Sequence, residues 1–176
     1  MNHTRMNHEH GVSENWQYSL KDFVPLIGAF IAVFALTFIL IFVFNARTAI
    51  EYMKLFMGSF FVIFGILKIV NIQGFAEAYS MYDIISKRFK TYGYIYPCIE
   101  LGLGVAYIAG LAIIIINWIT LVVMLVSALG VFLKLREGEV VPCACLGVVF
   151  KVPMTWVTLF EDLLMAFMAT FILFGL

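Results

Sequence analysis

Two cysteines separated by a single residue, Cys143 and Cys145, are the strongest sign of chemistry in this sequence. They lie in the stretch Val-Pro-Cys-Ala-Cys-Leu-Gly at residues 141–147, between a proline and a glycine. Thiols this close can form a small, strained and therefore oxidising disulfide. They can equally give two thiolates to a soft metal ion such as Cu(I). A third interpretation, in which both are small buried hydrophobes in a loop, stays open.

A structural zinc site is disfavoured at these cysteines. Such a site needs four ligands, and the sequence has no Cys-x-x-Cys pair to complete one. The N-terminal tail offers other soft-metal ligands, which could coordinate copper through imidazole and thioether groups. These are Met1, His3, Met6, His8 and His10. Because chain termini are often loose, a solvated, disordered tail is the alternative.

Several ionisable residues fall within apolar stretches, where a charge costs about 3 kcal/mol or more and marks a functional site by default. We expect Glu100 to pair with Lys68, and Glu161 rather than the adjacent Asp162 to face the same site. Cys98, close to Glu100 in sequence, is a candidate resolving thiol. The acids could instead form a buried ion pair that only fixes helix register. Lys68 could extend its ammonium group to the membrane interface.

The composition requires a lipid environment for these residues. Of 176 residues, 64% are hydrophobic and 12% are charged, and the mean hydropathy is +1.03. Soluble domains are only about half apolar. The 11 basic and 11 acidic residues give zero formal charge, which provides no reason to expect nucleic acid. The sequence therefore predicts an all-α membrane protein that contacts the lipid bilayer.

Five stretches have the length and polarity of membrane-spanning helices. They are residues 24–44, 55–70, 94–116, 118–135 and 154–176, and residues 48–54 can extend the second backwards. The third and fourth are expected to form a tight hairpin at Asn117 and Trp118. Residues 71–92 show aromatic side chains at helical spacing, which predicts an interfacial amphipathic helix. Gly102, Gly104 and Gly110 indicate close helix packing.

The basic residues predict the orientation of this helical bundle of five spans, because short cytoplasmic loops are enriched in Lys and Arg. One side carries nine bases, namely Arg5, Lys21, Lys68, Lys87, Arg88, Lys90, Lys134, Arg136 and Lys151, and the other carries Arg47 and Lys54. We therefore expect the N-terminus and the Cys-x-Cys loop to be cytoplasmic. The expected location is a bacterial inner membrane.

Four motifs together resemble a known family. They are Phe64-Gly65-Ile66-Leu67-Lys68, Gly74-Phe75, Glu100-Leu101-Gly102 and Cys143-Ala144-Cys145-Leu146-Gly147. They are similar to the DoxX-like membrane proteins, and specifically to the MauE branch of methylamine utilisation. The resemblance covers roughly residues 48–176 and implies a DoxX-like four-helix unit of redox-associated type, which supports thiol chemistry during maturation of partner proteins. Residues 1–22 then form a flexible polar tail and residues 23–47 an extra N-terminal span.

The leading hypothesis is a membrane redox-associated protein in which Cys143 and Cys145 exchange a disulfide with a partner protein. Cys98 is then the candidate resolving thiol, and Lys68, Glu100 and Glu161 tune the site. The alternative is a soft-metal permease or membrane metal chaperone, in which the same two cysteines are metal ligands for Cu(I) or Hg(II). A third hypothesis is an accessory subunit that carries no chemistry. No motif in the sequence indicates another cofactor.

Overall fold

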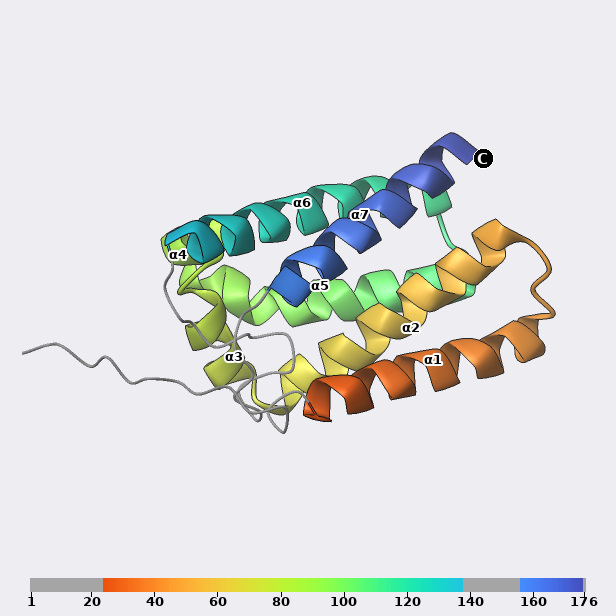
Figure 1. The fold of residues 1–176 in the computed structure, drawn as a ribbon, viewed down its shortest axis with the longest axis horizontal. Coiled ribbons are helices and arrows are strands. Elements are labelled where there is room, and N and C mark those ends of the chain that lie inside the picture. The colour runs from red at the N-terminus through yellow and green to blue at the C-terminus, as the bar shows by residue number, and fades with distance from the viewer. Residues whose placement is uncertain (1–23, 138–155, 176) are drawn as a thin grey trace, which may run out of the picture.

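The computed structural model describes residues 24–137 and 156–175, which form seven α-helices and no strand. In chain order these are α1 (Val24–Phe44), α2 (Ala49–Val70), α3 (Ile72–Tyr79), α4 (Ile84–Arg88), α5 (Lys90–Ala109), α6 (Ile113–Glu137) and α7 (Trp156–Gly175). The five long helices lie side by side along the long axis, with α3 and α4 at one end (Figure 1). The all-helical prediction is confirmed within this part of the chain.

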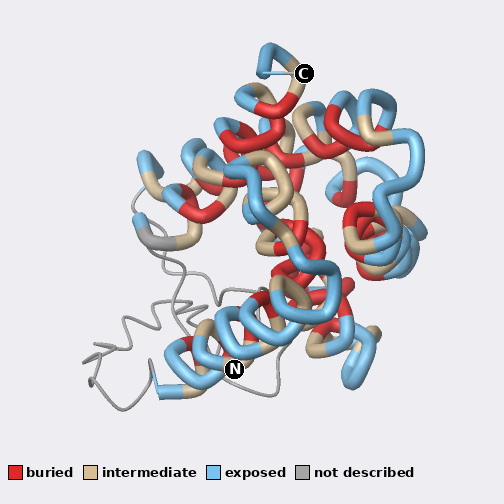
Figure 2. The backbone as a smooth tube through the Cα atoms, turned by 90° about the vertical axis from the view of Figure 1, so that its right-hand side faces the viewer, coloured by how far each residue is buried: buried red, intermediate tan, exposed pale blue. Residues whose placement is uncertain are grey.

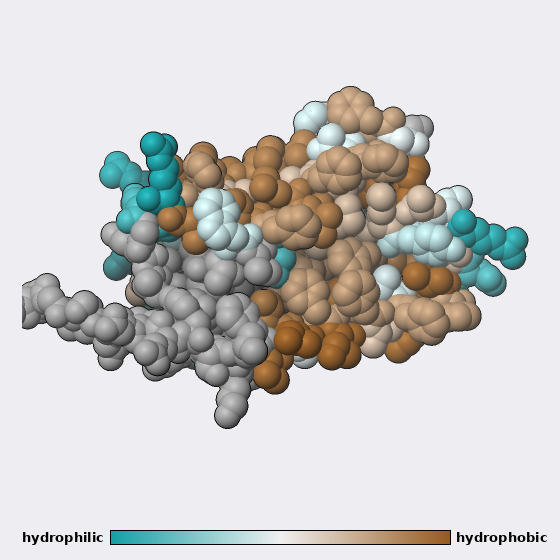
Figure 3. All heavy atoms as spheres, in the orientation of Figure 1, coloured by the Kyte–Doolittle hydropathy of each residue, from teal (hydrophilic) through white to brown (hydrophobic). Residues whose placement is uncertain are grey.

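Four of the long helices are long and apolar enough to cross a membrane: α1, α2, α6 and residues Thr158–Gly175 of α7. At 1.5 Å per residue their lengths match a hydrocarbon core of about 30 Å. The described face of the molecule is apolar along its middle, with hydrophilic side chains gathered towards the two ends (Figure 3). The remaining long helix, α5, has 20 residues but is less apolar, since it contains four tyrosines, Pro97 and Glu100, and it is not among the helices of membrane-spanning composition. The five predicted spans are therefore not confirmed.

Each long helix buries one side against its neighbours. α2 packs against both α1 and α5, α6 packs against α7, and the short helices α3 and α4 pack against α5. Buried positions run along the inward sides of the helices, whereas exposed positions form the periphery (Figure 2). The largest fully buried side chains include Phe61, Phe64, Phe75 and Tyr107. An aromatic core therefore joins α2, α3 and α5.

The turn between the third and fourth long helices lies at Gly110, and not at Asn117 as expected. Gly110 has a φ of 68°, a left-handed conformation that glycine adopts without steric cost, and it ends α5. Asn117 instead lies inside α6, fully buried, where its side-chain oxygen accepts a hydrogen bond of 2.8 Å from the hydroxyl of Tyr107. Asn117, the polar residue between two apolar runs, is therefore not a turn residue. It is a buried hydrogen-bonding group within α6.

The segment 71–92 forms two short helices where one amphipathic helix was expected. Asn71 caps α3 by accepting from the N–H of Gly74, and Asp83 begins a new helix, α4, by accepting from the N–H of Ser86. Phe75 and Tyr79 are buried against the other helices, whereas Phe89 is 65% exposed. The aromatic face of α3 is therefore part of the protein core.

Two glycines allow the backbones of α2 and α5 to touch. A Cβ added at Gly58 would lie 3.1 Å from the carbonyl oxygen of Gly104, and one added at Gly104 would lie 2.9 Å from the backbone nitrogen of Val62. The expectation of close packing therefore holds at Gly104. At Gly102 an added Cβ meets nothing within 4 Å, so this glycine faces outwards.

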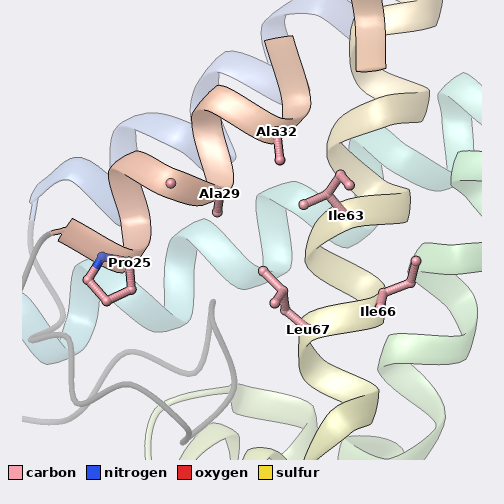
Figure 4. Close-up of a pocket in the computed structure, with 7 residues that line it drawn as sticks. Pro25, Ala29, Ala32, Ile63, Ile66 and Leu67 are labelled. Atoms are coloured by element: carbon pink, nitrogen blue, oxygen red, sulfur yellow. The ribbon is translucent and has the colours of Figure 1, made fainter. Parts of the chain in front are cut away.

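An apolar groove lies between α1 and the C-terminal half of α2. Its volume is about 320 Å³, and it is lined by Pro25, Gly28, Ala29, Ala32, Ile63, Ile66 and Leu67. The small side chains of Ala29 and Ala32 come from α1, and Ile63 and Leu67 come from α2 on the facing side (Figure 4). Since none of these side chains is polar, we place no chemistry in the groove.

Candidate functional site

Lys68 and Glu100 form a buried ion pair between α2 and α5. Lys68 lies in the last turn of α2, and its ammonium nitrogen donates to the two carboxylate oxygens of Glu100 at 2.5 and 2.6 Å. Their side chains are only 9% and 2% exposed. Each charge is therefore withdrawn from solvent and neutralised by the other. The pairing expected from the sequence is present, and Glu100 faces protein.

Aromatic rings from α3 and α5 cover the ammonium group. Lys68 Nζ lies 5.0 Å from the ring centroid of Tyr96 and 5.6 Å from that of Phe75, within the range of cation–π attraction. The Tyr79 ring stacks on Phe75 at 5.1 Å and lies 4.6 Å from Tyr96. This arrangement explains why α3 turns its aromatic face inwards: it closes the ion pair off from the end of the bundle.

Two acids of α7 approach the same point. Glu161 is 7% exposed, and among the described residues neither its Oε1 nor the buried Oδ2 of Asp162 has a hydrogen-bond partner. Together with Lys68 and Glu100 they line a cavity of about 30 Å³. That volume accommodates one or two waters. The sequence favoured Glu161 over Asp162, but the structure places both at the cavity, because adjacent residues can flank one seam between helices.

Hydroxyl and aromatic side chains complete the cavity wall. The described lining beyond the charged groups consists of Phe60, Phe64, Phe75, Tyr79, Tyr82, Tyr96, Met124, Ser127, Val131 and Thr158. They come from α2, α3, α5, α6, α7 and the turn after α3. The cavity is therefore an enclosed polar centre that joins all the described helices except α1 and α4.

Asp83 is a buried acid that the sequence reasoning missed. Its Oδ1 accepts from the N–H of Ser86 at 2.7 Å, while its Oδ2 is buried and has no hydrogen-bond partner within residues 24–137 and 156–175. Burial raises the pKa of Asp83, and burial likewise raises the pKa of Tyr79 well above its usual value. The available signal was the aspartate itself, since Asp is a preferred residue at the start of a helix.

The structure does not bring Cys98 to this centre. Cys98 is a free, exposed thiol on α5, whereas Glu100, two residues later and about 200° around the helix, is buried. Lys134 pairs with Glu137 at 2.6 Å near the end of α6. Cys143, Cys145 and the N-terminal Met and His residues lie outside the described residues. The cysteine stretch is nevertheless bounded by described helices, since α6 ends at Glu137 and α7 begins at Trp156.

Comparison with known proteins identifies a family for this chain. No curated protein and no solved structure matches the chain. The family described as methylamine utilisation protein MauE matches residues 46–175, which include α2 to α7 and both cysteines of the Cys-x-Cys stretch. The match starts after α1 and covers well over half of the chain. With its apolar helices of membrane-spanning length, the chain is a membrane protein that belongs to the MauE family.

Proposed function

We propose that this protein is a redox-associated membrane protein in which Cys143 and Cys145 form a reversible dithiol that exchanges with a partner protein. The observation that supports it best is the family match, which extends through the Cys-x-Cys stretch. The family description connects its members with methylamine utilisation, so a disulfide-bearing protein of that process is the proposed partner.

The exchange needs only the two thiols and the partner's disulfide. One thiolate attacks a partner sulfur, which forms a mixed disulfide and releases one partner thiolate. The second thiolate then attacks the mixed disulfide, so that Cys143 and Cys145 become oxidised and the partner becomes a dithiol. Two electrons pass to the partner, and the two protons from the cysteine thiols end on the partner's sulfurs. The reverse reaction oxidises the partner, and relative reduction potentials set the direction.

The polar centre is proposed to position the helices that flank the cysteines. Glu161 and Asp162 lie near the start of α7, and Ser127 and Val131 lie towards the end of α6. These helix ends bound the cysteine stretch. Because Glu100 neutralises Lys68 directly, Lys68 does not act as a free positive charge for a thiolate. Lys68, Glu100 and Glu161 are therefore positioning residues in this proposal.

Counting free thiols in the purified protein tests the exchange. The reduced protein, in detergent or lipid nanodiscs, is treated with a thiol oxidant and then with a mass-tagged maleimide. We expect two of the three cysteines to lose reactivity together and to regain it with reductant. Cys98→Ser is the matched control and should keep the change. Cys143→Ser and Cys145→Ser should each abolish it within the monomer.

The alternative use of the same thiols, soft-metal handling, predicts a different result. Wild-type protein loaded with Cu(I) would retain about one ion after desalting, since two thiolates suit this ion. Either cysteine variant would lose it. Retained metal together with an unchanged thiol count under oxidant would contradict disulfide exchange and support metal handling. If the protein neither retained the metal nor lost thiol reactivity under oxidant, that result would support the accessory-subunit hypothesis.

A further inference from the structure

The cavity between α2, α5, α6 and α7 has an unbalanced set of charged groups. Its described lining holds one cation, Lys68, and three carboxyl groups, those of Glu100, Glu161 and Asp162. Lys68 contacts both carboxylate oxygens of Glu100. Among the described residues, Glu161 Oε1 and Asp162 Oδ2 are buried and have no hydrogen-bond partner. The described wall of the cavity therefore holds no second cation to balance these two carboxyl groups.

Neither of these carboxyl groups is well placed to remain ionised. A buried carboxylate without a counter-charge is very costly, even with one hydrogen bond such as that between Asp162 and the Ser127 side chain, and such a group neutralises by taking up a proton. Water cannot hydrate the charge fully, because a cavity of about 30 Å³ holds only one or two molecules. The two acids are also adjacent in sequence, so two negative charges would repel each other.

We propose that Glu161 and Asp162 form a proton-binding site inside the bundle, in which the two carboxyl groups hold at least one proton at neutral pH and hydrogen-bond to water in the cavity. A protonated carboxyl group can donate as well as accept, which suits a cavity that also contains hydroxyl groups. The site goes beyond thiol exchange and does not require the cysteines.

The groups that face the site act on its protonation in opposite directions. Glu100 and Tyr96 face it from α5, Ser127 from α6, and Thr158 from α7 itself, while Tyr79 and Tyr82 face it from the α3 side. Lys68 of α2 borders the same cavity, and its positive charge opposes the binding of a proton as well as of a metal cation. Burial and the nearby acids Glu100 and Asp83 favour a proton on the two carboxyl groups.

Infrared spectroscopy of the purified protein in lipid tests this directly, because a protonated carboxyl group has a C=O stretching band distinct from that of a carboxylate. We expect the wild-type protein to show the protonated band at neutral pH and to lose it at strongly alkaline pH. Glu161→Gln and Asp162→Asn should each change the band, and the double variant should remove the contribution of this site. Glu77→Gln is the control, since Glu77 is exposed and lies outside the cavity, and it should leave the band unchanged.

The same variants in a Cys143→Ser/Cys145→Ser background should give the same spectra, so the result is independent of thiol exchange. A wild-type spectrum without the protonated band at neutral pH would overturn the proposal even if a variant fails to fold. The proposal would also be overturned if the difference spectrum showed that the double variant had lost only carboxylate bands that the wild type contains. A thermal midpoint that rises with Na⁺, but not with a bulky organic cation, and only when both acids are present, would assign the site to a metal cation instead.

Discussion

The ion pair between Lys68 and Glu100 gives a residue-scale prediction, because both side chains are buried and each depends on the other. Replacing Lys68 by Met leaves the Glu100 charge without its partner, which should lower the free energy of unfolding by about 3–5 kcal/mol. Lys68→Met/Glu100→Leu should cost less than Lys68→Met alone, because no buried charge remains. Thermal or denaturant unfolding in detergent measures both.

The control for this comparison is the ion pair between Lys134 and Glu137. Glu137 is 52% exposed, so Glu137→Gln should change stability little. If the variant Lys68→Met/Glu100→Leu were less stable than the wild type by the sum of the effects of Lys68→Met and Glu100→Leu measured singly, the two residues would be acting independently. The pair would then have no coupling energy, contrary to the geometry.

Asp83 gives a prediction about pH. Burial raises its pKa in the folded state above that in the unfolded state, so Asp83 favours folding at acidic pH and this contribution is lost as pH rises through the folded pKa. Asp83→Asn keeps the helix cap on Ser86, since Asn caps as well as Asp, but removes the charge. The variant should match the wild type at acidic pH and be more stable at neutral pH. A difference in thermal midpoint that does not vary with pH would contradict this.

Sequence reasoning found part of the polar centre from the cost of charge in lipid. That argument selected Lys68, Glu100 and Glu161, and the structure places all three at one cavity. It selected Glu161 and left out Asp162, because adjacent residues point about 100° apart on a helix, whereas in the structure both line the cavity. It placed Cys98 nearer the site than it lies, because depth along a helix does not fix which face a side chain occupies.

At the scale of elements, the contact between α2 and α5 depends on Gly104. Gly104→Ala should destabilise the protein by about 1–3 kcal/mol, because the added methyl meets backbone atoms of α2 that cannot move aside. Gly102→Ala is a matched control in the same helix. It has open space around its Cβ and should be neutral or slightly stabilising, since Ala favours helix over Gly. Unfolding midpoints of both variants check the contrast.

If Gly102→Ala proved as damaging as Gly104→Ala, the packing of α2 on α5 would have to differ from the one described. Equal tolerance of both substitutions would lead to the same conclusion. The pair therefore tests the orientation of α5 around its own axis, which also decides that Glu100 faces inwards and Cys98 outwards.

Helix boundaries were predictable where the chain changes composition sharply. The first span, residues 24–44, coincides with α1, and the proposed backward extension of the second span agrees with the start of α2 at Ala49. Thr48 and Glu51 form a capping box there. The hairpin turn was misplaced because Gly110 stands within an apolar run, where hydropathy gives no signal. The turn is marked by the left-handed backbone conformation of Gly110.

At the scale of the whole molecule, α1 stands apart from the other helices. It packs against α2, and the family match begins at residue 46, just after it. Its outward-facing side chains include Ile31, Phe34 and Phe38, each at least 60% exposed. A helix that is apolar on all sides suits contact with lipid. The extra N-terminal span expected from the sequence is therefore compatible with the extent of the match.

The distribution of basic residues between the two ends of the molecule predicts its orientation in the membrane. Lys87, Arg88 and Arg136 lie at the end formed by α4 and the last turn of α6, whereas Arg47 and Lys54 lie at the opposite end (Figure 1). Because cytoplasmic loops carry the excess of Lys and Arg, we expect the first end to be cytoplasmic. The Cys-x-Cys stretch joins α6 to α7 at this end, so its thiols should be kept reduced by glutathione and thioredoxin.

Labelling of single-cysteine variants in intact cells with a membrane-impermeant maleimide measures this orientation. With Cys98→Ser and Cys145→Ser, the remaining thiol of Cys143 should be protected until the cells are lysed. The matched control is Arg47→Cys in a chain whose three native cysteines are replaced by serine, and it should be labelled from outside. Labelling of Cys143 before lysis, with protection of the control, would reverse the orientation. The dithiol would then face an oxidising compartment, where a stable disulfide between Cys143 and Cys145 becomes favourable. That result would favour disulfide exchange over soft-metal handling.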